Sequence, residues 1–120
     1  MSWAEARSSC QANAPQNGDL ASVPDQATSD FLSTLTTEIA WIGGHWTEED
    51  GWTWSDGTPW GFESWHPGEP NNWGGIPEDY IATNFGSAGE WNDFPMEGST
   101  AHPVVGFICQ YQGLYYAYCI

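Results

Sequence analysis

Residues 69–93, which read EPNNWGGIPEDYIATNFGSAGEWND, carry the most specific signal in the chain. It gathers three acidic or amide-bearing motifs, Glu69-Pro70-Asn71, Glu78-Asp79 and Trp91-Asn92-Asp93. Carboxylate and amide oxygens are the ligands that calcium prefers, and calcium accepts roughly six to eight of them in irregular geometry. We therefore expect one calcium ion to be half-enclosed by Glu69, Asn71, Glu78, Asn92 and Asp93.

A calcium ion held by separate loop segments keeps coordination positions open. The Glu and Asn side chains around it have spare lone pairs and N–H groups. A vicinal diol would bind the metal while its hydroxyls donate to a Glu and accept from an Asn. This chemistry predicts that Glu69, Asn71, Glu78 and Asn92 also hold a sugar.

Five motifs follow one another along the chain: Trp41-Ile42-Gly43-Gly44, Glu69-Pro70-Asn71, Glu78-Asp79, Trp91-Asn92-Asp93 and Phe107-Ile108-Cys109. Together with a helical opening from Trp3 to Cys10, they resemble the C-type lectin domain, the calcium-dependent carbohydrate-recognition domain, in its Glu-Pro-Asn form. The resemblance implies an α+β fold over a single domain, residues 1–120, with two helices packed on small antiparallel sheets beside a long, ordered calcium-binding loop region. It also implies the calcium and sugar site named above, and a cis peptide bond before Pro70.

The same resemblance implies a disulfide between Cys10 and Cys109, and hence an extracellular or secreted protein. The family's second disulfide is absent, because Tyr80 and Met96 stand at its cysteine positions. We expect an apolar contact between these two side chains in its place. Cys119 is left over, either as a buried thiol or as an intermolecular bridge.

A second, weaker metal site is implied at Asp50, Asn72 and Asp79, beside Glu78, but Trp46 stands where the family would supply an acidic ligand. Sugar selectivity is also open to two interpretations. The Glu-Pro-Asn motif implies mannose-type ligands, which include mannose, glucose, N-acetylglucosamine and fucose. Trp73 would favour galactose instead if its ring stacks on the sugar, since aromatic faces pack on apolar surfaces; otherwise it packs within its loop.

Composition narrows the range of partners. Sixteen acids against one base give a formal net charge of −15. Such a surface repels backbone phosphates, so glycans are favoured as partners over nucleic acid. No apolar run reaches the roughly 20 residues that span a bilayer, and the opening residues are not a signal peptide. We therefore expect no membrane insertion, and a mature or excised chain.

Helices are expected from Ser2 to about Asn13 and from Pro24 or Asp25 to about Thr37, because capping residues precede apolar positions at helical spacing. The second helix repeats Phe31, Leu32, Leu35 and Ile39, all expected in the core. A strand is expected from Val104 to Tyr111. Residues 114–119 are rich in strand formers. They are expected to fold back as a hairpin that replaces the family's missing N-terminal strand, or to exchange between two copies in a homo-oligomer.

The remaining aromatic and histidine residues favour structural roles. Trp41, Trp52, Trp54, Trp65 and Trp91 are expected as core or loop anchors, and His45, His66 and His102 as surface or loop residues without a metal. An enzyme is not expected, because a calcium-bound carboxylate keeps a low pKa and cannot act as the proton donor of a glycosidase. The other alternative is calcium-independent recognition of a protein or an ice surface.

Overall fold

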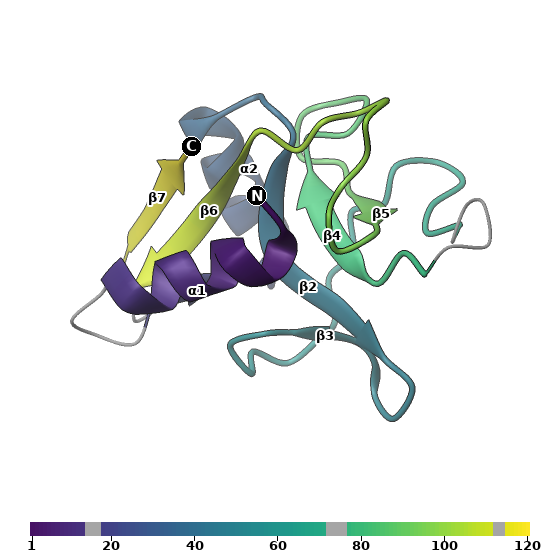
Figure 1. The fold of residues 1–120 in the computed structure, drawn as a ribbon, viewed down its shortest axis with the longest axis horizontal. Helices are drawn as coiled ribbons and strands as arrows, with labels where there is room; N and C mark the ends of the chain where they lie inside the picture. The colour runs from purple at the N-terminus through teal and green to yellow at the C-terminus, as the bar shows by residue number, and fades with distance from the viewer. Residues whose placement is uncertain (14–17, 72–76, 112–114) are drawn as a thin grey trace.

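The computed structural model describes residues 1–13, 18–71, 77–111 and 115–120. Within these ranges two helices and seven strands follow in a mixed order (Figure 1). The helices are α1 (Trp3–Asn13) and α2 (Gln26–Leu35). The strands are β1 (Gly18–Leu20), β2 (Ala40–Thr47), β3 (Gly51–Trp54), β4 (Tyr80–Thr83), β5 (Asn92–Phe94), β6 (Gly106–Tyr111) and β7 (Tyr115–Cys119). This is the α+β fold predicted from the sequence.

Both helices begin where the capping residues predict. The Glu5 amide donates to Ser2 Oγ (3.1 Å) and the Ser2 amide donates back to Glu5 Oε1 (2.8 Å), a capping box at the start of α1. At α2 the side chain of Asp25 accepts from the Thr28 amide (2.8 Å). These bonds satisfy amides that have no partner inside the helix.

One core prediction on α2 is wrong. Leu32 is buried, and Leu35 and Ile39 are partly buried, but Phe31 is 48% exposed. Its ring lies 5.7 Å from the ring of Tyr116 on β7. Phe31 therefore packs at the rim of the contact between helix and hairpin, where helical spacing alone does not distinguish core from edge.

A single sheet in the order β1-β6-β2-β4-β5 connects the two halves of the molecule. β3 forms a hairpin with β2, and β2 pairs with β6 in parallel through Ala40 and Trp41. β4 and β5 form the far end, with Ile81 opposite Asp93 and Ala82 opposite Asn92. The sheet thus places the residues expected to bind calcium at the end away from α1 and the hairpin of β6 and β7 (Figure 1).

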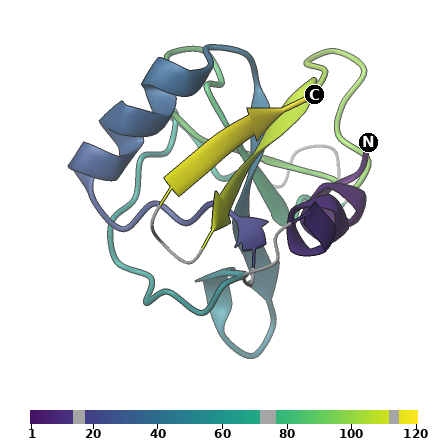
Figure 2. The same ribbon diagram turned by 90° about the vertical axis from the view of Figure 1, so that its left-hand side faces the viewer.

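The C-terminal segment folds back on β6 within the same chain, as predicted. β7 pairs antiparallel with β6 from Phe107 opposite Cys119 to Tyr111 opposite Tyr115. Figure 2 shows this hairpin between α2 and α1. Gly106 is required where the two strands meet, since an added Cβ there would lie 2.5 Å from the Cys119 carbonyl oxygen. Replacement of the family's first strand by β7 stays an interpretation.

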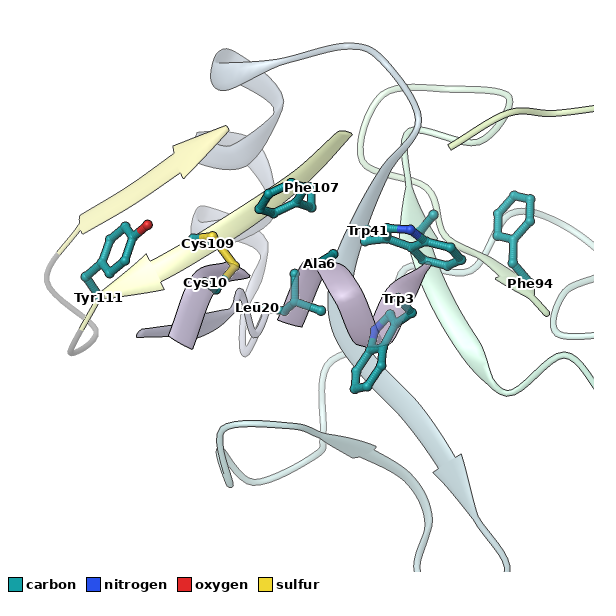
Figure 3. Packing of buried hydrophobic residues seen from close by; sticks show 10 residues of the cluster. Trp3, Ala6, Cys10, Leu20, Trp41, Phe94, Phe107, Cys109 and Tyr111 are labelled. Atoms are coloured by element: carbon teal, nitrogen blue, oxygen red, sulfur yellow. A yellow bond between two sulfur atoms is a disulfide. The ribbon is translucent and has the colours of Figure 1, made fainter. Parts of the chain in front are cut away.

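The core behind α1 contains the disulfide (Figure 3). Cys10 and Cys109 are bonded with an S–S distance of 2.04 Å, joining α1 to β6. Cys119 is a partly buried free thiol, and burial raises its pKa.

The residues that replace the family's second disulfide both contact the first turn of α1. The Tyr80 ring lies 4.8 Å from the Trp3 ring. Met96 accepts hydrogen bonds at its carbonyl oxygen from the Trp3 amide (2.9 Å) and at Sδ from the Ala4 amide (3.3 Å). The first turn of α1 therefore connects Tyr80 with Met96. The sequence predicts a direct contact between these two side chains and gives no sign of this link through the helix.

The tryptophans predicted as anchors are buried or partly buried. Trp41, Trp54 and Trp91 are almost fully buried. Trp52 and Trp65 pack against a second core cluster, whose buried residues are Ala21, Val23, Leu32, Ala40, Ile42, Trp54, Ile81, Trp91 and Ile108. Among the described helices, none is long and apolar enough to cross a membrane.

Candidate functional site

Trp91 fixes the position of the Asn92-Asp93 pair. Its side chain is fully buried, and its backbone joins the loop of residues 64–66 by two hydrogen bonds. The Trp91 amide donates to the Ser64 carbonyl (2.8 Å), and the His66 amide donates to the Trp91 carbonyl (2.9 Å). The loop that leads to Glu69 is thereby held alongside β5.

The turn that follows aims Glu69 and Asn71 at β5. The Glu69 amide donates to the His66 carbonyl (2.9 Å), and Gly68 adopts a φ of 90°, a conformation that favours glycine. The peptide bond between Glu69 and Pro70 is cis, as the resemblance implied. A cis bond before proline lets flanking side chains lie on the same side of a tight turn.

Polar groups from this turn and from β5 converge. The Asn71 amide donates to Asp93 Oδ1 (3.3 Å), and Asn71 Nδ2 donates to Glu69 Oε2 (3.3 Å). Burial raises the pKa of Glu69 to about 7, and its hydrogen bond with Asp93 and the negative charges of Asp93 and Glu78 act in the same direction, while His66 opposes them. The structure thus brings together Glu69, Asn71, Glu78 and Asp93, a group that carries excess negative charge.

Two oxygens, one on Glu69 of this group and one on Asn92 beside Asp93, are buried without a partner among the described residues. Glu69 Oε1 and Asn92 Oδ1 accept no hydrogen bond from any described residue. A buried acceptor left unpaired costs roughly 1–3 kcal/mol, so such atoms in a native protein call for a ligand, an ion or water. Both belong to the residues predicted to bind calcium.

A pocket of about 270 Å³ opens over these atoms. Its polar side carries Glu69, Asn71, Glu78 and Asn92. Its other side is formed by residues that the sequence did not single out for the site: Phe85, Phe94, Ser99, Ala101 and His102. The Phe85 ring packs against two histidine rings, with its centroid 5.1 Å from that of His66 and 5.0 Å from that of His102. No spacing in the sequence signals this wall, because residues 99–102 lie outside the five motifs, between Trp91-Asn92-Asp93 and Phe107-Ile108-Cys109.

His66 and His102 lie in loops, as expected, but the expectation of a surface or loop position is wrong for His45, which is a partly buried residue of a strand. His45 is on β2 with its ring 5.3 Å from the Trp3 ring. His66 Nδ1 lies 2.7 Å from Glu90 Oε1. Within the described ranges no group of three or more His, Cys, Asp or Glu side chains is arranged to hold a metal ion. The three carboxylates of the predicted calcium set, Glu69, Glu78 and Asp93, therefore do not form such a group by themselves.

The described residues implied for a second metal lie in separate parts of the structure. Asp79 lines a separate pocket of about 270 Å³ together with Glu78 and Asp93. Asp50 is exposed at the turn between β2 and β3, where its amide donates to Thr47 Oγ1 (3.1 Å). Asn72, and Trp73 of the selectivity question, lie outside the described residues.

The comparisons with known proteins agree with this arrangement. The family model described as Lectin C-type domain matches residues 1–111. This chain belongs to the C-type lectin domain family. Members of the family are non-enzymatic carbohydrate-binding proteins, so the prediction against an enzyme is confirmed.

This C-type lectin domain is 33% identical over 117 residues to a lectin of Pleurodeles waltl, covering 92% of this chain and 64% of that protein. Among solved structures, the cow C-type carbohydrate-recognition domain of CD23, crystallised in the presence of a GlcNAc2Man3 oligosaccharide, has a TM-score of 0.69 and 31% identity, covering 82% of this chain and 73% of that one. A calcium-independent type II antifreeze protein has a TM-score of 0.67 and 27% identity, covering 80% and 71%.

The domain spans 26%, 64% and 43% of the length of three curated relatives that it matches. C-type lectin domains typically bind calcium, yet the family includes calcium-independent members. Its relatives include secreted or extracellular proteins and membrane receptors. Calcium, the sugar and the cellular location are therefore matters for proposal.

Proposed function

We propose that this domain binds one calcium ion through Glu69, Asn71, Glu78, Asn92 and Asp93, and holds the vicinal diol of a mannose-type sugar on that ion. The observation that carries the proposal is the pair of buried, unpartnered oxygens, Glu69 Oε1 and Asn92 Oδ1. They come from two segments and flank one pocket. A cation between them would satisfy both atoms at once.

The electrostatics of the site support a cation independently. Glu69 is held with Asp93 and Glu78 nearby, and its raised pKa reflects burial together with their repulsion. The single lysine or arginine of the chain is Arg7, which forms an ion pair with Asp19 (3.1 Å). A divalent ion would relieve this repulsion and return Glu69 to its ionised form.

A bound calcium would supply Lewis-acid coordination to two sugar hydroxyls. This chain's own residues orient the diol: glutamate oxygens accept from the hydroxyls and asparagine amides donate to them. The proposal follows the Glu-Pro-Asn motif in selecting mannose-type ligands, namely mannose, glucose, N-acetylglucosamine and fucose. The cow CD23 structure, determined in the presence of a mannose-containing oligosaccharide, supports this class. Galactose is the alternative if Trp73 stacks on the sugar.

The deciding experiment is isothermal titration of mannose and of galactose, each with calcium and again with excess chelator. We expect calcium-dependent heat for mannose, with a Kd on the order of 1 mM for one monosaccharide. Calcium-dependent heat for galactose and none for mannose would indicate that Trp73 stacks on the sugar and sets the selectivity. Binding of either sugar that persists in chelator would contradict the role of the metal.

A calcium-independent function is the second candidate, because a calcium-independent antifreeze protein has this fold. It is tested without sugar, by equilibrium dialysis of calcium. Stoichiometric binding that is lost in Asn92→Ala plus Glu69→Ala, which removes two oxygen ligands, supports the proposed site. Absence of calcium binding to the unaltered chain would favour recognition of a protein or surface.

Avidity and location complete the proposal. Millimolar affinity per site becomes useful only when several sites act together, so we propose a homo-oligomer, joined through Cys119 or the C-terminal strand, on glycoconjugates outside the cell. The disulfide between Cys10 and Cys109 supports an oxidising compartment. Sedimentation of the oxidised protein, with Cys119→Ser as the matched variant, tests the cysteine route.

A further inference from the structure

A second pocket lies beside the cis proline, Pro70. It has a volume of about 270 Å³ and is lined by Trp46, Trp52, Pro70, Glu78, Asp79 and Asp93. Among the described residues, Glu78 lines this pocket and also the pocket beside Asn92. The lining combines two indole rings with three carboxylates, of which Glu78 and Asp93 also belong to the proposed calcium set and Asp79 does not.

The pairing of β2 with the segment before β4 positions the two halves of this lining. The Trp46 amide donates to the Asp79 carbonyl (2.8 Å), next to the paired residues His45 and Tyr80. Residues opposite each other in an antiparallel pair project from the same face of the sheet. The Trp46 ring and the Asp79 carboxylate therefore stand side by side at the pocket.

The aromatic half is built and accessible. Trp46 pairs with Trp52 at the next position of the hairpin, with ring centroids 5.6 Å apart and an edge-to-face angle of 69°. Trp52 packs against Trp65 (5.1 Å), which fixes its place. Trp46 nevertheless remains 44% exposed. A large aromatic ring held in position and left open to solvent beside carboxylates is suited to a ligand.

The lining fits an organic cation better than a second calcium ion. Calcium needs oxygen ligands on most sides at about 2.3–2.6 Å, whereas here indole rings form one wall and the space is close to the lower end for small-molecule pockets, roughly 300 Å³. An alkylammonium group has a diffuse charge and an apolar surface. It is attracted to the face of a tryptophan within about 6 Å and pairs with carboxylates at the same time.

We propose that this pocket binds an organic ammonium group, with Trp46 contacting its alkyl surface and Asp79 neutralising its charge. The chain as a whole favours such a ligand, since its net charge of −15 attracts cations. Trp46 and Asp79, which carry the proposal, lie outside the five residues proposed to bind calcium, whereas Glu78 and Asp93 of that set also line the pocket.

The test is titration of ¹⁵N-labelled protein with choline, following the indole N–H signal of Trp46, in calcium and again in chelator. The matched probe is 3,3-dimethylbutan-1-ol, which has the shape of choline without its charge. We expect saturable shifts with choline, with a Kd on the order of 1 mM, and none with the neutral alcohol. Nα-acetyl-lysine methylamide then distinguishes a primary ammonium from a methylated one.

Three variants localise the effect. Trp46→Leu should weaken choline binding about fivefold or more, Trp46→Phe should weaken it less, and Asp79→Asn should weaken it as well. Glu48→Gln, an exposed acid on the same hairpin turn, should leave binding unchanged. Mannose binding by Trp46→Phe confirms that the variant is folded.

The proposal is overturned if the neutral alcohol binds as well as choline, if Glu48→Gln weakens binding as much as Asp79→Asn, or if no probe shifts Trp46. Methyl mannoside that shifts Trp46 with full saturation would reassign the pocket to sugar. If each chain bound two calcium ions and the second ion displaced choline, the pocket would be a metal site. Loss of mannose binding alone leaves the choline result standing.

Discussion

Glu69 is the residue at which stability and binding conflict. Its partly buried carboxyl group lies beside Asp93 and Glu78, and its pKa is raised to about 7 from an ordinary 4.5. Glu69→Gln keeps the shape and removes the charge. We expect the variant to bind calcium at least about tenfold more weakly, since loss of a supporting second-shell group alone costs that much. Its melting temperature in chelator at about pH 8 should be higher than that of the unaltered protein.

The control for this change is Glu97→Gln, an exposed acid in the loop after β5. It should alter neither calcium affinity nor the melting temperature in chelator. Calorimetry with and without calcium measures both quantities. If Glu69→Gln lowered the melting temperature in chelator, the unpaired carboxyl group would not be a source of strain, and the argument for a cation at this position would fail.

The same residue determines the expected pH dependence. Between pH 4.5 and about 7 the native, metal-free protein holds a proton on Glu69 that the unfolded chain has lost. Stability in chelator should therefore fall as pH rises through about 7. Calcium must displace this proton, so calcium affinity should fall as pH drops below about 7, by up to roughly tenfold per pH unit from this group.

These opposite slopes are measured by thermal melts across pH in calcium and in chelator. A calcium affinity that is constant between about pH 7 and 5 would contradict the assignment of Glu69 as a ligand. A melting temperature in chelator that rises toward alkaline pH would show that other groups dominate the titration.

Single residues also show what the sequence could and could not predict about the site. Glu69, Asn71 and Asp93 were identified because their side chains have the chemistry of calcium ligands, and the structure brings them together. Phe85 and His102 were not, because an aromatic ring carries no signal of ligand binding and the loop of residue 102 reaches the pocket only through the tertiary fold. The sequence predicts which residues of a motif can bind a metal. It does not predict which residues of distant loops pack beside them.

At the scale of elements, β7 carries the clearest prediction. It covers one edge of β6 along five residue pairs, and Tyr116 and Tyr118 pack on the second core cluster. Removing residues 113–120 should destabilise the protein by about 3 kcal/mol or more, since each lost hydrogen bond contributes roughly 0.5–1.5 kcal/mol. The melting temperature should drop by about 10 °C or more.

The matched control removes Ile120 alone, which is 92% exposed, and should have little effect. Thermal unfolding by circular dichroism compares the two truncations. An unchanged midpoint after removal of the whole segment would show that β7 is an accessory strand, and would end the interpretation that it replaces the family's first strand.

The elements themselves were largely predictable because their signals are local. Ser2 and Glu5 mark the start of α1, Asp25 marks α2, and each makes the expected capping bonds. The link through α1 between Tyr80 and Met96 was missed, since it joins segments far apart in sequence through the backbone of residues 3 and 4. Backbone acceptors such as the Met96 carbonyl leave no mark in a sequence.

For the whole molecule, the disulfide closes a loop with a sequence separation of 99. In the chain-entropy model such a bond contributes about 4–5 kcal/mol, by restricting the unfolded chain. Cys10→Ala with Cys109→Ala should lower the free energy of unfolding by a similar amount in denaturant titrations. Cys119→Ser is the matched control and should retain most of the stability, because that thiol has no partner bond. If both variants lost the same free energy of unfolding, the loss would come from removing a buried sulfur atom and not from opening the disulfide.

The charge of the whole molecule provides a final test of specificity. The sixteen acids repel one another in the folded state, with one base to offset them. Added salt should therefore raise the melting temperature in chelator by screening this repulsion, over a Debye length of roughly 8 Å at about 0.15 M.

Magnesium and calcium at the same ionic strength screen this repulsion equally. A site built from Glu69, Asn92 and Asp93 should distinguish them, because calcium tolerates irregular oxygen ligands and magnesium demands near-octahedral geometry. We therefore expect calcium to raise the melting temperature further than magnesium, and Glu69→Gln to remove the difference. If calcium and magnesium raised the melting temperature of the unaltered protein equally, the acidic residues would act only through their surface charge and not as a calcium site.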